Sequence, residues 1–158
     1  MNLKYIIIHC SATRCNRAYS PEQLEADHRA RGFRSAGYHY YIRRDGAVVR
    51  MRKETEVGAH TKGYNSVSLG VCYEGGLTEE GTPHDTRTEA QKEAMKRLLR
   101  ELVIKYPGVS ISGHRDFSPD LNGDGKVTSD EWEKMCPCFD AEKEYCYLNL
   151  LSENLVGL

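Results

Sequence analysis

Two histidines of this chain each lie at the end of a short apolar segment that is typical of a β-strand. His9 closes the run Tyr5 to Cys10, and His114 follows the run Val109 to Ser112. Where strands alternate with helices, ligand sites gather beyond the carboxyl ends of the strands. Two histidines in that position can therefore bind one metal ion.

Cys136 supplies a candidate third ligand. A His, His, Cys set leaves the fourth position of a tetrahedral zinc ion open, as a catalytic zinc site requires. Spacing alone leaves a second interpretation open, in which the two histidines are structural and the thiol is inert. It also leaves open whether Cys136 or Cys138, on either side of Pro137, supplies the sulfur.

A second candidate metal site lies between His114 and Cys136. Residues 120–131 match the calcium-binding loop of EF-hands, including the glycine at its sixth position. Pro119 excludes the usual entering helix, so the segment resembles single loops of the dockerin type. The alternative is a turn rich in Asp, Asn and Gly that holds no ion. The predicted calcium ligands are Asp120, Asn122, Asp124, Lys126 (through its carbonyl) and Glu131.

The position of this loop suggests what calcium would do. We expect Asp130 to Glu133 to begin an exit helix and Val127 to pack inward. Because the loop separates His114 from Lys134 and Cys136, bound calcium would order the segment that carries these residues.

Strands and helices alternate along the rest of the chain. Ser20 and Pro21 start a helix that runs to about residue 31, and Thr88 with Gln91 starts a longer one that ends before Pro107. Asp45-Gly46 predicts a hairpin. These elements predict an α/β fold, a central mixed sheet flanked by helices. The predicted strands span residues 5–10, 38–43, 47–52, 68–73 and 109–112.

Composition places limits on the function. The 158 residues suit a single domain, 1–158, with the calcium-like loop as an insert at about 118–133. The formal net charge of −1 argues against non-specific nucleic-acid binding. The apolar run near Met1 is too short for a signal peptide or a membrane span, so we expect a chain that is made in the cytoplasm and has no membrane partner. We also expect a monomer.

We expect mostly reduced cysteines, with Cys10 and Cys72 in the core.

Seven short motifs follow one another over about residues 4 to 140. Their content and order resemble the zinc-dependent N-acetylmuramoyl-L-alanine amidases, the family of phage amidase-type lysozymes and peptidoglycan recognition proteins. No single motif is specific, but the set is. The motifs are His9–Thr13, Gly37–Tyr40, Arg44–Gly46, Gly58–Asn65, Ser68–Val71, Gly113–Asp116 and Lys134–Pro137.

The resemblance implies a role for each matching residue. It implies that zinc is bound by His9, His114 and Cys136, since the family's cysteine ligand precedes the proline. It implies that Tyr38 and Lys134 are the catalytic pair, and that the substrate is the amide between N-acetylmuramic acid and L-alanine in peptidoglycan. Three further residues in matching motifs are candidates for binding substrate: His39, His60 and Asn65.

The resemblance favours a phage or prophage endolysin, which would act on the cell wall after release from the cytoplasm. A non-catalytic peptidoglycan-binding module is the main alternative, and Cys136 argues against it because many recognition-only members lose that residue. A zinc hydrolase that acts on another amide is a further alternative. Related phage lysozymes also bind a polymerase, and the sequence neither supports nor excludes such a partner.

Overall fold

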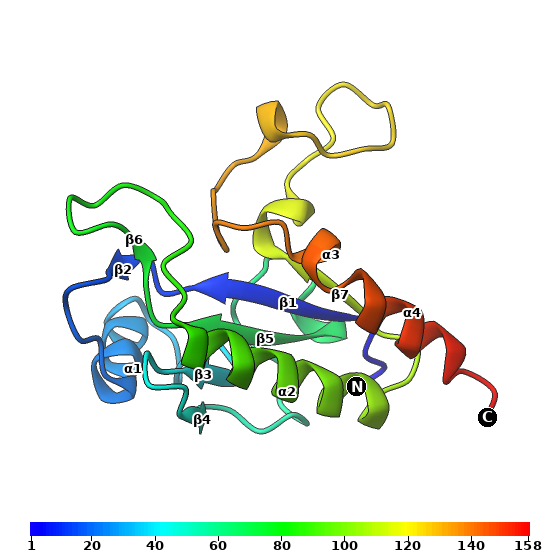
Figure 1. Ribbon diagram of the computed structural model, residues 1–158, viewed down its shortest axis with the longest axis horizontal. Coiled ribbons are helices and arrows are strands. Elements are labelled where there is room, and N and C mark those ends of the chain that lie inside the picture. Colours follow the sequence, from blue (N-terminus) through cyan, green and yellow to red (C-terminus); the bar gives the residue numbers. More distant parts are fainter.

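A five-stranded sheet in the order β4-β3-β5-β1-β7 forms the centre of the computed structural model, which describes residues 1–158 (Figure 1). β1 (Tyr5–Cys10) lies between β5 (Ser68–Tyr73) and β7 (Ser110–Gly113) and is parallel to both. β3 (Tyr40–Ile42) is parallel to β5, and β4 (Val48–Arg50) pairs with β3 in the antiparallel sense. The predicted mixed sheet flanked by helices is confirmed.

The two faces of the sheet are covered unequally. Side chains alternate between the faces of a strand, so Ile6 and Ile8 point to one face and His9 to the other. The face of Ile6 and Ile8 carries the main core, which α2 (Glu89–Lys105) and two C-terminal helices cover. α1 (Pro21–Ala30) covers part of the opposite face through a much smaller apolar cluster. The face that bears His9 therefore has room for a site.

The two long helices begin at the predicted caps. The Ser20 hydroxyl accepts a hydrogen bond from the Gln23 amide at 3.1 Å, and Thr88 and Gln91 form a reciprocal capping box. The Gln91 side chain is buried and also donates to the carbonyls of Ile42 and Glu74, at 3.2 and 2.9 Å. The cap thus attaches the start of α2 to the ends of β3 and β5.

Two C-terminal helices, α3 (Ala141–Glu144) and α4 (Cys146–Asn154), were not predicted. Asp140 caps α3 by accepting the Lys143 amide at 3.0 Å. The Asn149 side chain on α4 accepts from the Ile111 amide at 2.7 Å and donates to the Ile111 carbonyl at 3.2 Å. Because β7 is an edge strand, this side chain takes the place of a neighbouring strand. None of the helices combines the length and apolar character that crossing a bilayer requires.

The hairpin strands β3 and β4 are shorter than predicted. A small parallel pair, β2 (Thr13–Arg14) and β6 (Gly76–Leu77), forms a second sheet beyond the end of β1. Further short 3-10 turns span Asn65–Val67 and His114–Phe117.

The insert at 118–133 projects from the body of the molecule (Figure 1). The predicted exit helix over Asp130 to Glu133 is wrong, because only a 3-10 turn forms over Ser129–Glu131 and Trp132 is extended. The Arg115 guanidinium lies 3.8 Å from the centre of the Trp132 ring. This contact packs Trp132 against the turn that follows β7 and draws it out of a helical path.

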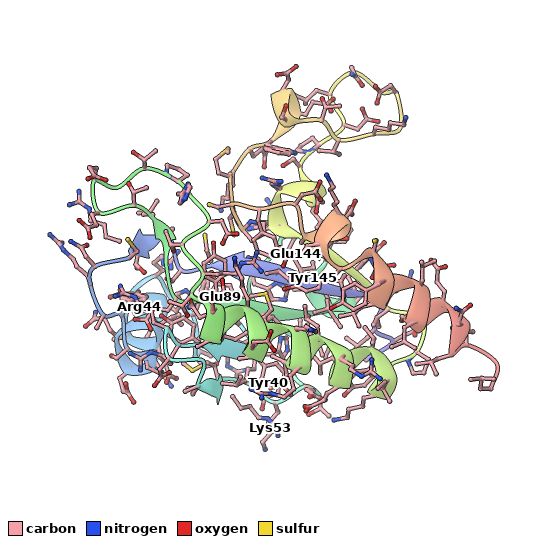
Figure 2. All side chains as sticks on the ribbon, viewed as in Figure 1. Tyr40, Arg44, Lys53, Glu89, Glu144 and Tyr145 are labelled. Carbon is pink, nitrogen blue, oxygen red and sulfur yellow. The ribbon has the colours of Figure 1, made fainter.

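A buried arginine fastens the C-terminal segment to the core. The Arg87 side chain is fully buried, donates to both Glu144 oxygens at 2.7 and 2.9 Å, and donates to Asp85 Oδ2 at 2.9 Å. Its guanidinium also lies 3.4 Å from the centre of the Phe139 ring. Glu144 and Tyr145 are labelled at this junction in Figure 2. Arg87 therefore holds the segment that follows Cys136.

We expect Arg87→Met to lower the free energy of unfolding by about 2–3 kcal/mol, because it leaves two carboxylates without their partner. The effect is smaller than the roughly 3–5 kcal/mol for a fully buried pair, since Asp85 and Glu144 are partly exposed. Urea unfolding measures it. The matched control is Arg29→Met, which breaks an exposed pair with Glu25 and should cost about 0.5 kcal/mol or less. Equal stability of the two variants would contradict the assignment.

Candidate metal centre

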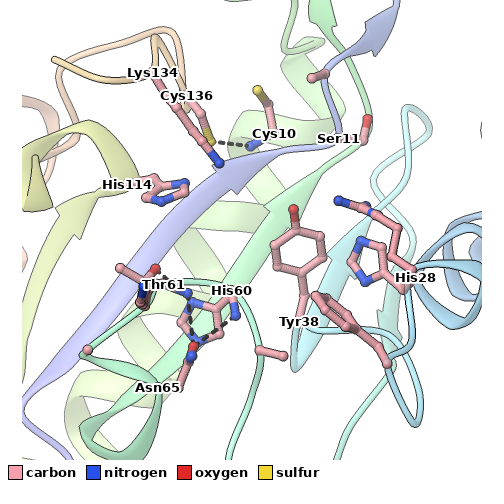
Figure 3. A pocket seen from close by; sticks show the side chains of 16 residues that line it. Cys10, Ser11, His28, Tyr38, His60, Thr61, Asn65, His114, Lys134 and Cys136 are labelled. Atoms are coloured by element: carbon pink, nitrogen blue, oxygen red, sulfur yellow. Dashed lines mark hydrogen bonds between the residues drawn. The ribbon is translucent and has the colours of Figure 1, made fainter.

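His9, His114 and Cys136 converge at one end of the sheet. Their potential donor atoms all lie within 4.8 Å of one another, and no other set of three or more His, Cys, Asp or Glu residues in the chain does so. His9 Nδ1 is 3.9 Å from Cys136 Sγ, and the rings of His9 and His114 are 4.6 Å apart. Because β1 and β7 are adjacent and parallel, their carboxyl ends meet at the same edge. Figure 3 shows His114 and Cys136 on the same side of the pocket that opens at this edge.

Cys136 reaches this edge from a distant part of the sequence, and main-chain contacts hold it there. Its sulfur accepts a hydrogen bond from the Cys10 amide at 3.3 Å, and its carbonyl accepts one from the Arg115 amide at 2.9 Å. The Tyr73 hydroxyl donates to the Pro137 carbonyl at 2.7 Å. A Cβ at Gly113 would lie 2.6 Å from Pro137 Cδ, so only glycine allows this approach.

The donor set and its protonation suit a zinc ion. Zinc bonds of about 2.0–2.3 Å in a tetrahedral arrangement place donor atoms about 3.4–3.6 Å apart, close to the His9–Cys136 separation. Burial, followed by the charges of His60, His114 and Lys134, holds the pKa of His9 well below its usual range. Burial and the charge of Lys134 lower the pKa of His114 to about 4. Both imidazoles are therefore neutral at pH 7, as metal ligands must be.

A cavity of about 540 Å³ opens beside the three donors. His114, Cys136, Tyr38 and Lys134 line it, whereas His9 lies beneath its wall and is 1% exposed. Three cationic side chains face the cavity and no carboxylate does: Arg31, Lys62 and Lys134. The cavity therefore suits an anionic ligand.

Tyr38 and Lys134 lie on different sides of this cavity (Figure 3). The Tyr38 ring centre is 5.0 Å from that of His9 and 5.4 Å from that of His28. Burial raises the pKa of Tyr38 well above its usual value, so the phenol keeps its proton and can donate a hydrogen bond. Lys134 is exposed and precedes Cys136 by two residues, which brings its positive charge to the metal centre.

His60 and Asn65 also line the cavity, but His39 does not. His39 is fully buried, and both of its ring nitrogens are occupied: Nε2 by the Glu56 carbonyl at 2.8 Å and Nδ1 by the Gly70 amide at 3.0 Å. The structure therefore gives no support to the prediction that His39 binds substrate. His39 instead connects the loop after β4 to β5.

The insert does not gather its carboxylates as a cation site does. Both Glu131 oxygens accept backbone amides, from Leu121 and Asn122 at 2.8 and 3.1 Å and from Thr128 at 2.8 Å. The Asp120 carboxylate accepts the amides of two loop glycines at 2.8 Å each. Asp124 Oδ1 likewise accepts the Lys126 amide. The calcium prediction thus gains no support from the structure.

All six cysteines are free thiols. The predicted burial of Cys10 and Cys72 is confirmed, at 5% and 0% exposed. Cys138 donates its thiol proton to the Gly76 carbonyl at 3.5 Å and is not in the donor group. Of the two sulfurs that flank Pro137, the structure therefore brings Cys136 to the histidines.

Several residues of the cavity were not predicted to have a role. His28 accepts the Gly37 amide at 2.8 Å and forms part of the wall, beside Arg31 and Phe33. The available signal was the spacing of Leu24 and His28, four residues apart on the buried face of α1. Thr61 was also missed, and its hydroxyl lies 3.4 Å from His9 Nε2.

Comparisons with known proteins relate nearly the whole chain to one enzyme family. The family profile of N-acetylmuramoyl-L-alanine amidases matches residues 1–137. An endolysin of Klebsiella phage KP32 is 38% identical over 138 residues, which cover 87% of this chain and 82% of that protein. An uncharacterized protein of Haemophilus influenzae is 52% identical over 96 residues, 61% of this chain and 83% of that protein. The solved structure of an N-acetylmuramoyl-L-alanine amidase, LysC from Clostridium intestinale, aligns with a TM-score of 0.71 at 27% identity, covering 94% of this chain and 86% of that one.

We expect the stability of the metal-free protein to fall between pH 7 and pH 5. Burial lowers the pKa of His60 to about 3 and that of His114 to about 4, so in this window the unfolded chain binds protons that the folded chain does not. Stability present above pH 6.5 is then lost as the pH falls toward these values. Urea unfolding in a chelator measures the loss, and His114→Gln should make it smaller. Stability that is equal or higher at pH 5 would contradict the burial of neutral histidines.

Proposed function

This chain belongs to the N-acetylmuramoyl-L-alanine amidase family and is an enzyme of that family, and we propose that it uses zinc to hydrolyse the amide between N-acetylmuramic acid and L-alanine. One observation carries the proposal. The three donors His9, His114 and Cys136 meet beside a cavity that also presents Tyr38 and Lys134. A module that only binds peptidoglycan would have no need of this combination.

His9, His114 and Cys136 would hold the ion and leave one position open toward the cavity. Zinc, when bound, supplies a Lewis acid that polarises a carbonyl group and lowers the pKa of water. The chain itself keeps both histidines neutral by burial, as the lowered pKa values of His9 and His114 indicate. The Cys10 amide donates a hydrogen bond to the Cys136 sulfur and would keep it directed at the ion.

Lys134 and Tyr38 would supply the remaining chemistry. Attack on an amide carbonyl places negative charge on its oxygen, and a positioned cation or hydrogen-bond donor stabilises that charge. We assign this role to the Lys134 ammonium. The neutral Tyr38 hydroxyl would donate a hydrogen bond that orients the attacking water or the carbonyl, and these two roles are interchangeable on geometry alone.

The charge of the cavity supports a peptidoglycan substrate. Peptide stems of peptidoglycan carry free carboxylates, and Arg31, Lys62 and Lys134 face the cavity without an opposing acid. Asn65 uses its carbonyl oxygen to accept the amides of His60 and Thr61 at 2.8 and 2.9 Å. Its amide nitrogen is left for a ligand, so substrate binding by Asn65 stays a prediction.

We also propose that the enzyme acts on the cell wall as an endolysin. The relative from Klebsiella phage KP32 supports this, because it matches 87% of the chain. In this proposal residues 1–158 form one domain, with 118–133 as an insert that calcium orders.

Digestion of purified peptidoglycan tests the proposed reaction. We expect new amino groups of L-alanine to appear, to be abolished by His9→Ala or by a chelator, and to return when zinc is added. Binding without new amino groups would indicate a recognition module. Amino groups of another residue would indicate a different amide, and new reducing sugar ends would indicate a glycosidase; any of the three contradicts the proposal.

We expect Lys134→Ala and Tyr38→Phe each to lower kcat by about 10²–10³-fold, the usual cost of removing one donor to a developing oxyanion. Zinc content, measured by atomic emission, should stay at the wild-type level. Lys143→Ala on the exposed face of α3 is the matched control and should leave kcat unchanged. Near-wild-type activity of Lys134→Ala would remove that residue from the mechanism.

Calcium binding is tested on protein that has been stripped with a chelator and reloaded with zinc. If the insert binds calcium, a concentration of about 100 times Kd should raise Tm by roughly 5–10 °C. The variant Asp120→Ala should abolish the shift, because it removes the ligand at the first loop position. A Tm that does not respond to calcium in the wild-type protein would leave the insert as a turn stabilised by its own side chains.

A further inference from the structure

The two ring nitrogens of His9 face different surroundings. Nδ1 is directed at Cys136 Sγ, 3.9 Å away, and so at the proposed metal. Nε2 lies 2.9 Å from His60 Nδ1 and 3.4 Å from Thr61 Oγ1. A nitrogen that binds a metal uses its lone pair, so the proton of the neutral ring must sit on the other nitrogen. His9 therefore donates from Nε2, and His60 Nδ1 is the acceptor at hydrogen-bond distance.

The His60 ring packs closely against two glycines, Gly58 and Gly70. A Cβ at Gly70 would lie 2.8 Å from the ring atoms Cγ and Cδ2, and one at Gly58 would lie 2.7 Å from Cδ2. The ring thus occupies space that two glycines leave free. Asn65 fixes the backbone by accepting the His60 amide at 2.8 Å. This packing restricts the His60 ring to one position beside His9.

The hydrogen bonds beyond His60 are consistent with a single tautomer. If His60 Nδ1 accepts from His9, its own proton lies on Nε2, which is 3.4 Å from Ser68 Oγ. The Ser68 hydroxyl in turn donates to the Tyr64 carbonyl at 2.8 Å and so has a lone pair to offer His60. Each donor in this chain has an acceptor, from His9 to the backbone of the loop before β5. The Thr61 hydroxyl lies beside the first of these bonds, 3.1 Å from His60 Nδ1.

We propose that His60 is a positioning residue of the metal centre: it accepts the Nε2 proton of His9 and thereby aims the Nδ1 lone pair at the ion. This inference rests on the proposed zinc centre and differs from the prediction that His60 binds substrate. His60 lines the cavity, and its Nδ1 edge faces His9, which is itself only 1% exposed, so this edge can act on the ligand from behind the metal. Groups in this position adjust the affinity of a metal site by about 10–100-fold.

Zinc affinity separates the two roles. The test compares wild type with His60→Leu, which removes the acceptor, and His60→Asn, which places an amide oxygen near the position of Nδ1. Competition against a chromophoric zinc chelator gives Kd for each protein. We expect His60→Leu to weaken zinc binding about 10–100-fold and His60→Asn to recover most of that loss. His84→Leu, at an exposed loop position, is the matched control and should leave Kd unchanged.

At saturating zinc, KM for a soluble muropeptide should change little in both His60 variants, by about twofold or less. A raised KM with wild-type zinc affinity in both variants would overturn the inference and return His60 to substrate binding. If His60→Leu does not fold, His60→Ser replaces it, since its short side chain cannot reach His9. Absence of zinc binding by the wild-type protein would overturn the proposed centre and this inference together.

Discussion

The position of β1 between two parallel neighbours is the constraint on which the rest of the structure depends. Hydrogen bonding to β5 and β7 on both sides fixes its register, and a shift by one residue would move His9 to the opposite face. The same pairing brings the end of β1 beside the end of β7, where His114 follows. Two proposed zinc ligands that are distant in sequence thus meet because of strand order alone.

The unequal coverage of the sheet decides where chemistry can occur. α2 and the C-terminal helices seal one face, and α1 covers only part of the other. His9 lies on the second face. Its burial keeps the imidazole neutral, and it lies beside His114 and Cys136, which line the cavity. Cys136, the third proposed ligand, needs a different kind of support, which the Cys10 amide, the glycine at 113 and the Arg87 anchor provide.

Much of this arrangement could be predicted from the sequence, for identifiable reasons. β1, β5 and the caps of α1 and α2 carry strong local signals, and the resemblance assigned His9, His114 and Cys136 to one centre. The C-terminal helices were missed because α3 is a single turn and both depend on packing against β7. The structural hydrogen bonds of His39 and the position of His60 beside His9 were not predictable, since both depend on contacts with residues on other strands and loops. The exit helix expected at the end of the insert does not form for the same reason, as Trp132 packs on Arg115.

The proposed metal centre holds one zinc ion between two imidazoles and one thiolate. X-ray absorption at the zinc edge of the purified protein tests this most directly, because it reports the elements bonded to the metal. We expect two nitrogen ligands at about 2.0–2.1 Å and one sulfur at about 2.3 Å, with a light atom in the fourth position. A shell without sulfur, or one with two sulfurs, would contradict it.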